Sequence, residues 1–459
     1  MKTTLFFIVS YFCFSTLFAQ EIVSSWVGVL DIPGAKLPVV FNIKQIGNEL
    51  TTTMDSPMQG VKDIPITKTT YEKNELSLTS SEMQIQYKGT LKSDQIEGIF
   101  SQGQMSLPLI LNRKKEGEST LKRPQTPKAP FDYKIEEVTF ENPTDRNTLA
   151  GTLTTPSNKK EFPVVILISG SGQQNRDSEI FGHKSFWVIA DDFAKKGIGV
   201  LRLDDRGVGG SNGASTNMTT QNFATDTNAA VEFIAKKGFQ EIGLIGHSEG
   251  GIIAPIVASQ NKKVKFIVSM AGPGISIDEL MILQTNAQGK LSGANEAQLK
   301  STSDLNRKLY ATVKNYQGND LQNEVKKILS NELEKLPKEQ QPSETEMENF
   351  LNDQSKSLSM PWYSYFLKIN PDDYWSKIKI PVLAINGTLD TQVTSKENLN
   401  GIKISLEKAK NRRFEIAELP NLNHLFQDAK IGSVEEYGQL EQTIAPIVLE
   451  KMSSWILKY

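Results

Sequence analysis

The pentapeptide Gly246-His247-Ser248-Glu249-Gly250 constrains the fold of this chain more than any other feature of its sequence. It follows an apolar run at residues 242–245 and leads into a helical pattern at residues 250–259. This is the Gly-x-Ser-x-Gly pattern in the strand–turn–helix context that the pattern requires. A residue on so sharp a turn adopts strained backbone angles, and the close packing of strand and helix leaves room only for small residues on either side. We therefore expect the Ser248 hydroxyl to stand exposed above a sheet as a candidate nucleophile.

From residue 131 onward, short apolar runs alternate with helical patterns. The runs are continuously apolar rather than alternating, which is typical of parallel strands buried on both faces. The runs are residues 164–169, 199–203, 243–246, 266–270 and 382–385, and the helical patterns are residues 186–196, 222–237, 250–259 and 440–457. We therefore predict an α/β fold with a mostly parallel sheet and helices on both faces. The carboxyl ends of its strands should carry the functional side chains.

An insertion at about residues 275–370 interrupts this alternation. It contains no good strand run, but its pattern is helical at residues 304–316, 321–336 and 344–358. Because a long insertion between the strands of an α/β sheet usually covers the site, we predict a helical cap. The aromatic stretch Pro361-Trp362-Tyr363-Ser364-Tyr365-Phe366 at its end has two interpretations. It lines an acyl or aryl pocket, or it forms the core of the cap itself.

The N-terminal part of the chain has a different pattern. Residues 22–113 contain short segments of alternating apolar and polar residues, separated by Gly, Asn, Asp and Ser, which predicts a small antiparallel β-domain, either a sandwich or a barrel. We assign no chemistry to it. Residues 114–130 are polar and contain three prolines, so they are interpreted as a linker. Residues 131–459 then form the larger, catalytic domain.

The first nineteen residues predict export. Lys2 precedes an apolar run at residues 5–18, and the small residue Ala19 follows it, which is the layout of a signal peptide of residues 1–19. A lipid anchor on Cys13 is disfavoured, because the residue before it is Phe12 where such signals need a small side chain. No run of 18 apolar residues predicts a membrane span. We expect the protein in the periplasm or outside the cell.

A serine hydroxyl is a poor nucleophile unless a base takes its proton. The chain has three histidines. His247 lies inside the turn and should point away from the serine, and His183 lies at the start of a helix, where capping or packing is the expected role. His424 lies on a loop between the predicted strand at residues 414–419 and the last helix. His424 is therefore the candidate base.

The acid that orients this base should lie between the serine and the histidine in chain order. Asp390 fits, because it falls on the loop just past the apolar run at residues 382–385. Its carboxylate would hold the imidazole in the correct tautomer and stabilise the imidazolium. Asp372 and Asp373 are the alternatives.

An oxyanion hole requires two backbone N–H groups that point at the reacting oxygen. The N–H of Glu249, directly after the candidate nucleophile, is one candidate. The second should come from the loop after an earlier strand, where the run at residues 164–169 leads into Gly170-Ser171-Gly172. The N–H of Ser171 is the first choice and that of Gly172 the second.

Composition excludes several classes of function. Lys and Arg number 51 against 53 Asp and Glu, a formal net charge of −2, which provides no basic surface for nucleic acid. Three histidines and one cysteine are too few for zinc fingers, iron–sulfur clusters or a disulfide framework. We expect no metal, no cofactor and no nucleic-acid partner, but a small-molecule substrate.

The region from about residue 131 to residue 459 resembles the α/β-hydrolase superfamily, in particular bacterial serine carboxylesterases. The resemblance rests on five blocks that occur in the same order: residues 169–177, 204–209, 246–251 and 387–393, and Asn423-His424. It implies Ser248 as nucleophile, Asp390 as acid and His424 as base. It also implies that Asp204, Asp205 and Arg206 brace loops. The turn reads Ser169-Gly170 where many relatives have His-Gly.

These observations predict a secreted serine hydrolase that cleaves carboxylic esters of small or medium acyl groups through an acyl-enzyme. A serine peptidase or amidase is the nearest alternative, because the same three residues perform both reactions. A catalytically silent binding protein on this fold is a third.

Overall fold

The computed structural model describes residues 21–32, 35–57, 61–103, 105–115, 122–214, 216–338 and 341–459. The predicted signal peptide lies outside the described residues. The chain divides into two compact units, Met1–Lys122 and Arg123–Tyr459. Within the described residues, no helix is long and apolar enough to cross a membrane.

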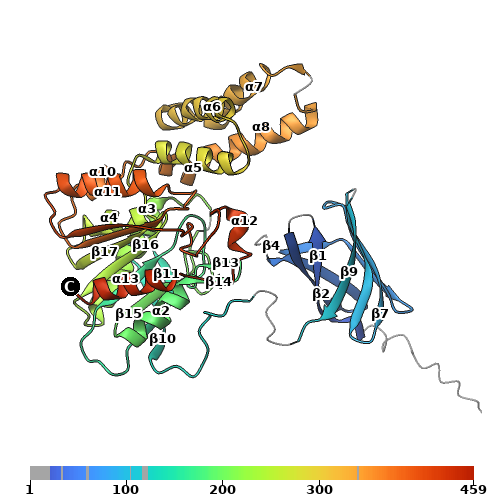
Figure 1. Cartoon of the computed structure of the whole chain (residues 1–459), viewed down its shortest axis with the longest axis horizontal. Helices are drawn as coiled ribbons and strands as arrows, with labels where there is room; N and C mark the ends of the chain where they lie inside the picture. The colour runs from blue at the N-terminus through green and yellow to red at the C-terminus, as the bar shows by residue number, and fades with distance from the viewer. Residues whose placement is uncertain are drawn as a thin grey trace, which may run out of the picture. The chain divides into compact units, whose positions relative to one another are not determined.

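The first unit is a single antiparallel sheet of nine strands, ordered β4-β3-β2-β1-β9-β8-β7-β6-β5. The strands are β1 (Ser24–Ile32), β2 (Ala35–Ile46), β3 (Glu49–Ser56), β4 (Val61–Ile66), β5 (Lys68–Glu72), β6 (Glu75–Ser80), β7 (Ile85–Lys92), β8 (Gln95–Gln102) and β9 (Met105–Arg113). The two end strands, β4 and β5, are neighbours in sequence, so the sheet curls until its ends meet (Figure 1). The Thr69 hydroxyl on β5 donates to the Thr52 hydroxyl on β3 over 2.9 Å across this closure. The predicted all-β domain is therefore a barrel rather than a sandwich.

The barrel is filled from one face of each strand, as the alternation in the sequence predicts. Every second residue of β7 is buried, and Tyr87 on this strand is completely buried beside Phe41, with ring centroids 5.8 Å apart. The Tyr87 hydroxyl lies 3.1 Å from the carbonyl oxygen of Ile96 and 3.2 Å from that of Leu109, so its polar end is satisfied inside the core.

The second unit is built on an eight-stranded sheet, ordered β10-β11-β15-β12-β16-β17-β18-β19. Its strands are β10 (Lys134–Asn142), β11 (Asn147–Thr155), β12 (Val164–Ile168), β15 (Gly199–Leu203), β16 (Ile242–His247), β17 (Val264–Met270), β18 (Val382–Gly387) and β19 (Phe414–Leu419). In the order of the sheet, every neighbouring pair from β15 through β12, β16, β17 and β18 to β19 is parallel. At the other edge, β10 pairs with β11 and β11 pairs with β15, both in the antiparallel direction. The mostly parallel sheet was predicted, and this antiparallel edge was not. A small hairpin of β13 (Glu179–Ile180) and β14 (His183–Lys184) lies outside the sheet.

Helices cover both faces of this sheet (Figure 1). One face packs against α2 (Ser185–Lys196) and α13 (Pro446–Ile456). The other packs against α3 (Thr220–Lys236), α4 (Gly250–Ala258), α10 (Asp372–Trp375) and α11 (Ser395–Lys408). The short α12 (Val434–Tyr437) follows the loop after β19. The last helix was predicted to start at residue 440, but Pro446 begins it, because proline favours the first helical position.

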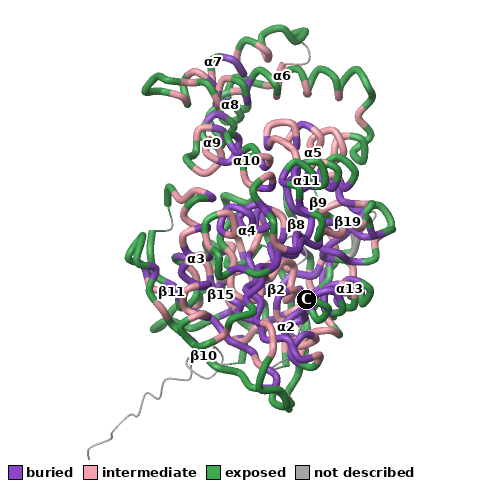
Figure 2. The backbone as a smooth tube through the Cα atoms, turned by 90° about the vertical axis from the view of Figure 1, so that its left-hand side faces the viewer, coloured by how far each residue is buried: buried purple, intermediate pink, exposed green. Residues whose placement is uncertain are grey.

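The predicted cap is present between β17 and β18. It consists of α5 (Ile277–Leu291), α6 (Glu296–Asn315), α7 (Leu321–Leu333), α8 (Glu344–Ser359) and α9 (Pro361–Leu367). Figure 2 shows that buried residues concentrate in the sheet and its covering helices, whereas much of α6 and α8 is exposed. The final helix, α9, ends with the buried Phe366 and Leu367 and returns the chain towards the sheet.

The segment predicted as a linker is fixed to the second unit in its latter part. The Arg123 guanidinium donates hydrogen bonds to the carbonyl oxygens of Phe181 at 2.8 Å, Gly438 at 2.9 Å and Leu440 at 3.0 Å. Gln125 donates to the carbonyl oxygen of Ile444 over 2.7 Å. Residues from Arg123 onward therefore belong structurally to the catalytic unit, ahead of the boundary at residue 131 that composition predicts.

Candidate active site

Ser248 lies on the turn between β16 and α4 with φ at 55°. This left-handed conformation is strained for a residue with a side chain, and it is the geometry expected of a nucleophile on a strand-to-helix turn. Close packing explains why glycines lie on both sides of Ser248. A Cβ on Gly246 would lie 1.9 Å from the carbonyl oxygen of Gly250, and one on Gly250 would lie 2.3 Å from that of Ile168. Any larger residue at either position would force strand and helix apart.

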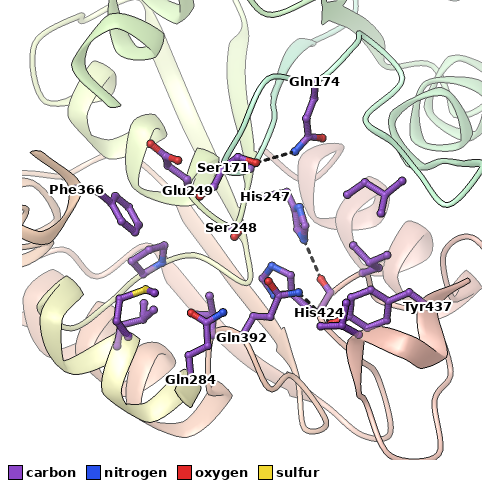
Figure 3. A pocket seen from close by; sticks show the side chains of 18 of the residues that line it. Ser171, Gln174, His247, Ser248, Glu249, Gln284, Phe366, Gln392, His424 and Tyr437 are labelled. Carbon is purple, nitrogen blue, oxygen red and sulfur yellow. Dashed lines mark hydrogen bonds between the residues drawn. The ribbon is translucent and has the colours of Figure 1, made fainter. Parts of the chain in front are cut away.

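A cavity of about 300 Å³ brings the candidate residues together (Figure 3). Ser248 and His424 both line it, although they are 176 positions apart in the chain. Ser171 and Glu249 lie on one side of Ser248 and His424 on the other. The loops after β12, β16 and β19 supply these side chains, so the carboxyl ends of parallel strands converge on the cavity as the fold requires.

Asp390 is the acid that contacts the candidate base. Its Oδ2 lies 2.8 Å from Nδ1 of His424, and both side chains are almost completely buried. The other oxygen, Oδ1, accepts hydrogen bonds from the backbone N–H groups of Gln392 and Val393, at 2.8 and 2.9 Å. The carboxylate is thereby held in one orientation, with Oδ2 directed at the imidazole.

The alternatives for the acid lie elsewhere. Asp372 is paired with Lys408 and accepts a hydrogen bond from Ser405 over 2.8 Å, both on α11. Asp373 is exposed on α10. Among the three candidates, Asp390 is therefore the one whose carboxylate contacts His424.

The turn after β12 lies against the nucleophile. A Cβ on Gly170 would lie 3.1 Å from Cβ of Ser248, so this position tolerates little beyond glycine. Ser171 and Glu249 line the cavity, whereas Gly172 lines a neighbouring one. The N–H of Ser248 donates to the carbonyl oxygen of Met270 over 2.9 Å and is not free for a ligand. Of the sequence-predicted oxyanion donors, the structure brings Ser171 and Glu249 to the nucleophile and leaves Gly172 aside.

A family profile described as the alpha/beta hydrolase fold matches residues 163–417, more than half of the chain. The chain belongs to the α/β-hydrolase family. The family assignment agrees with the resemblance seen in the sequence and with the parallel sheet, turn and cap described above.

Individual relatives of this α/β-hydrolase include enzymes with esterase names. The chain is 27% identical to Esterase EstD of Thermotoga maritima over 329 residues. This alignment covers 71% of this chain and 70% of that protein. Among solved structures, the esterase Pf2001 of Pyrococcus furiosus is 17% identical with a TM-score of 0.42, covering 75% of this chain and 99% of that one. The α/β hydrolase GrgF of Penicillium sp. sh18 is 20% identical with a TM-score of 0.42, covering 71% and 98%.

The other two histidines of this α/β-hydrolase have supporting roles. His183 is buried, with Nδ1 2.9 Å from the Thr443 hydroxyl and Nε2 3.0 Å from the carbonyl oxygen of Tyr437, which agrees with the packing role predicted for it. His247 does not simply point away from the site. Its Nε2 lies 2.8 Å from the carbonyl oxygen of His424, so it supports the loop that carries the candidate base. Burial lowers the pKa of both imidazoles to about 4.

Two buried carboxyl groups, those of Glu249 and Asp205, lie next to the turn after β12, and only the backbone N–H of Glu249 and a loop-bracing role for Asp205 were predicted from the sequence. The Glu249 carboxyl accepts hydrogen bonds from the Thr220 hydroxyl over 2.7 Å and from the Trp362 indole N–H over 3.1 Å. Burial raises its pKa. Asp205 accepts from the Ser169 hydroxyl at 3.0 Å and the Gln174 N–H at 2.8 Å, and burial raises its pKa to about 7.

The loop-bracing role implied for residues 204–206 agrees with their contacts. Asp204 pairs with Arg176 at 2.7 Å, and Arg206 pairs with Asp226 and Asp145, each at 2.7 Å. Within the described ranges, no group of three His, Cys, Asp or Glu side chains is arranged to hold a metal ion.

Proposed function

We propose that this α/β-hydrolase cleaves carboxylic esters of small or medium acyl groups through an acyl-enzyme formed on Ser248. The observation that carries the proposal is the Asp390–His424 hydrogen bond of 2.8 Å, in a cavity that His424 shares with Ser248. A carboxylate on Nδ1 leaves Nε2 unprotonated, which is the tautomer that a general base needs. The esterase name of the Thermotoga maritima relative supports the same reaction class.

The proposed reaction proceeds in two halves. The Ser248 Oγ bonds to the ester carbonyl carbon while its proton passes to Nε2 of His424, and the N–H groups of Ser171 and Glu249 bind the oxyanion. When the tetrahedral intermediate collapses, the C–O bond to the alcohol breaks and the alcohol leaves with the proton from His424. Water then attacks the acyl-enzyme and gives a proton to His424, which returns it to Ser248 as the carboxylic acid departs.

The cavity lining favours an uncharged acyl group. Leu280, Met281, Phe366 and Val393 contribute apolar surface, while the polar lining includes three glutamine side chains. No Lys, Arg or Asp occurs among the described residues that line it, so a charged substrate would find no direct counter-ion apart from the Glu249 carboxyl, which is already hydrogen-bonded. This supports a small or medium ester over a peptide with a free terminus.

Steady-state hydrolysis of p-nitrophenyl esters and of the matching anilides by the purified protein tests the proposal. We expect ester turnover and much slower anilide turnover. A fluorophosphonate should also block activity by modifying Ser248, which peptide mass analysis would detect. Anilides cleaved as fast as esters would favour an amidase, and a protein that neither turns over esters nor reacts with the phosphonate would contradict a serine hydrolase.

Export is a further part of the proposal, and its support is the N-terminal sequence alone. We expect the mature protein to begin after Ala19. The mass of the protein recovered from the periplasm or the medium of an expressing bacterium measures this. Recovery of the full-length chain in the cytoplasm alone would contradict export.

A further inference from the structure

A second cavity adjoins the catalytic one. Its volume is about 650 Å³, against about 300 Å³ for the cavity that contains Ser248. Two side chains, Ser171 and Trp362, line both cavities. Ser171 belongs to the turn after β12, and Trp362 is the second residue of the cap helix α9. The boundary between the two cavities is therefore formed by one residue of the predicted oxyanion turn and one residue of the cap.

The second cavity has the lining of a site for hydrocarbon. Met218, Phe223, Met360 and Pro361 contribute apolar side chains in addition to Trp362. Among the described residues that line it, Lys356 alone carries a formal charge, and Lys356 is exposed. An exposed lysine keeps its ammonium group in water while its methylene groups cover apolar surface. Alkyl chains could therefore enter this space without a large cost in desolvation of charge.

Trp362 is held in place as the wall between the cavities. Its indole N–H lies 3.1 Å from both carboxyl oxygens of Glu249, and its ring stacks on that of Phe366 with centroids 5.2 Å apart and planes 14° apart. The Tyr363 ring packs edge-on against it at 5.7 Å. Turning the indole away would leave the buried Glu249 carboxyl short of a donor, which is costly inside a protein. The Trp362 part of this boundary is thus held firmly in place.

The direction of the acyl chain follows from the chemistry of the proposed reaction. The departing alcohol takes its proton from His424, so the alcohol lies on the His424 side of Ser248. The acyl group extends to the other side. Figure 3 shows Ser171 and Glu249 on the side of Ser248 opposite His424, and Trp362 is hydrogen-bonded to that same Glu249. An acyl chain that grows longer therefore meets Trp362.

We infer that Trp362 determines the maximum acyl length of this enzyme by closing the catalytic cavity against the larger apolar one. The inference rests on the proposed ester hydrolysis, which it makes more specific. Of the two interpretations of the aromatic stretch at residues 361–366, the lining of a pocket thus applies to Trp362. Phe366 is buried and lines the catalytic cavity, and Tyr365 packs against the core around it.

Trp362→Ala should connect the two cavities. The test measures kcat/KM for p-nitrophenyl esters from acetate to decanoate with the full chain. Each methylene that enters the second cavity contributes roughly 0.8 kcal/mol, or about a fourfold gain. The ratio of decanoate to butyrate activity should therefore rise by about tenfold or more in the variant. Trp362→Leu, which opens less space and keeps an apolar residue on α9, should shift the ratio in the same direction by less.

Two further variants separate this role from a general effect on the cap. Phe350→Ala removes an exposed aromatic side chain from α8 that lines neither cavity, and its chain-length profile should match that of the wild type. Adding Met218→Trp to Trp362→Ala refills the second cavity and should cancel the gain. An unchanged decanoate-to-butyrate ratio in folded Trp362→Ala and Trp362→Leu variants would overturn the inference, as would a gain that survives Met218→Trp.

Two further measurements distinguish a failure of the role inferred for Trp362 from a failure of the proposed ester hydrolysis. Acetate esters of graded alcohols should show no gain in Trp362→Ala, and a gain confined to that series would overturn the acyl assignment. Labelling of Ser248 by fluorophosphonates with graded alkyl chains reports on the cavity without turnover. If the labelling of Ser248 depends on alkyl-chain length in the same way in the wild type and in Trp362→Ala, the role of Trp362 is refuted while the proposed function still stands. A serine that no probe labels, in a protein that cleaves no ester, refutes the proposed function.

Discussion

The imidazole of His247 donates a hydrogen bond from Nε2 to the backbone carbonyl oxygen of His424 over 2.8 Å. Their rings lie 4.8 Å apart with an interplanar angle of 45°. A carbonyl oxygen only accepts hydrogen bonds, so Nε2 of His247 must carry the proton. Burial lowers the pKa of His247 to about 4, and the imidazole is therefore neutral in this contact at neutral pH. The turn that exposes Ser248 thus also fixes the loop of its proposed base.

Replacing His247 with leucine should lower kcat more than it changes KM. The substitution leaves the buried carbonyl oxygen of His424 unpaired, which costs about 1–3 kcal/mol and lets the His424 loop move. His247→Gln, whose amide can donate, should recover part of the loss. Kinetics and melting temperatures of both variants check this. A leucine variant with wild-type kcat would show that the contact does not position the base.

Ser248→Ala should abolish ester hydrolysis and leave the fold intact. Removing the nucleophile of such a site typically lowers kcat on the order of 10⁴-fold or more, and alanine fits the crowded turn as well as serine does. Initial rates and circular dichroism measure the two effects. Ser259→Ala, at the far end of α4, is a matched control and should retain activity. More than a few per cent of residual turnover in Ser248→Ala would place the nucleophile elsewhere.

Asp390→Asn should lower kcat by roughly 10⁴-fold with little change in stability. The amide oxygen can still accept from the N–H groups of Gln392 and Val393, but the amide nitrogen would donate towards His424 and favour the wrong tautomer. The control is Asp373→Asn, an exposed residue on α10, which should behave as wild type. If Asp373→Asn were the inactive variant, the assignment of the acid would be wrong.

Asp205 should make the protein less stable as the pH rises from about 4 to about 7. Burial raises its pKa from 3.8 to about 7, with Asp226 and Glu249 acting in the same direction. Between these values the folded state holds a proton that the unfolded chain has released, so its free energy of unfolding falls with increasing pH. Asp205→Asn removes this titration.

Urea unfolding of wild type and Asp205→Asn from pH 4 to pH 8 isolates the effect of Asp205. The stability of the variant relative to wild type should increase across this range and level off above pH 7. Comparing the two proteins cancels the opposing contribution of the buried His183 and His247, whose lowered pKa values destabilise the fold as pH falls. A constant difference between the proteins would mean that Asp205 titrates near its ordinary value.

The melting temperature of a truncated catalytic unit should depend on the residue at which the chain begins. A chain that begins at Lys122 keeps the contacts of Arg123 with the carbonyl oxygens of Phe181, Gly438 and Leu440, whereas one that begins at Pro130 loses them. Hydrogen bonds to charged groups contribute about 1.5–3 kcal/mol each, so the shorter chain should melt at a clearly lower temperature. Equal melting temperatures would show that this anchor contributes nothing.

Local rules were enough to predict the main elements of this protein. The glycines around Ser248 follow from steric contact between chain neighbours, and the alternation of apolar runs with helical patterns follows from burial on both faces of a parallel sheet. The order Ser248, Asp390, His424 then selected an acid and a base from the loops after strands. Each of these inferences uses residues close in sequence, or the one edge of a sheet where strand ends must meet.

Only the tertiary structure decided which distant side chains meet. Glu249 and Trp362 are 113 residues apart, and His247 and His424 are 177 apart. Neither contact leaves a periodic signal in the sequence, because each depends on the order of strands in the sheet and on where the cap returns. The same holds for Arg123, which composition assigns to a linker although two of its partners, the carbonyl oxygens of Gly438 and Leu440, lie more than 300 residues away. A buried polar group forms hydrogen bonds with the partners that the fold places next to it. Those partners are determined only when the sheet and the cap have assembled.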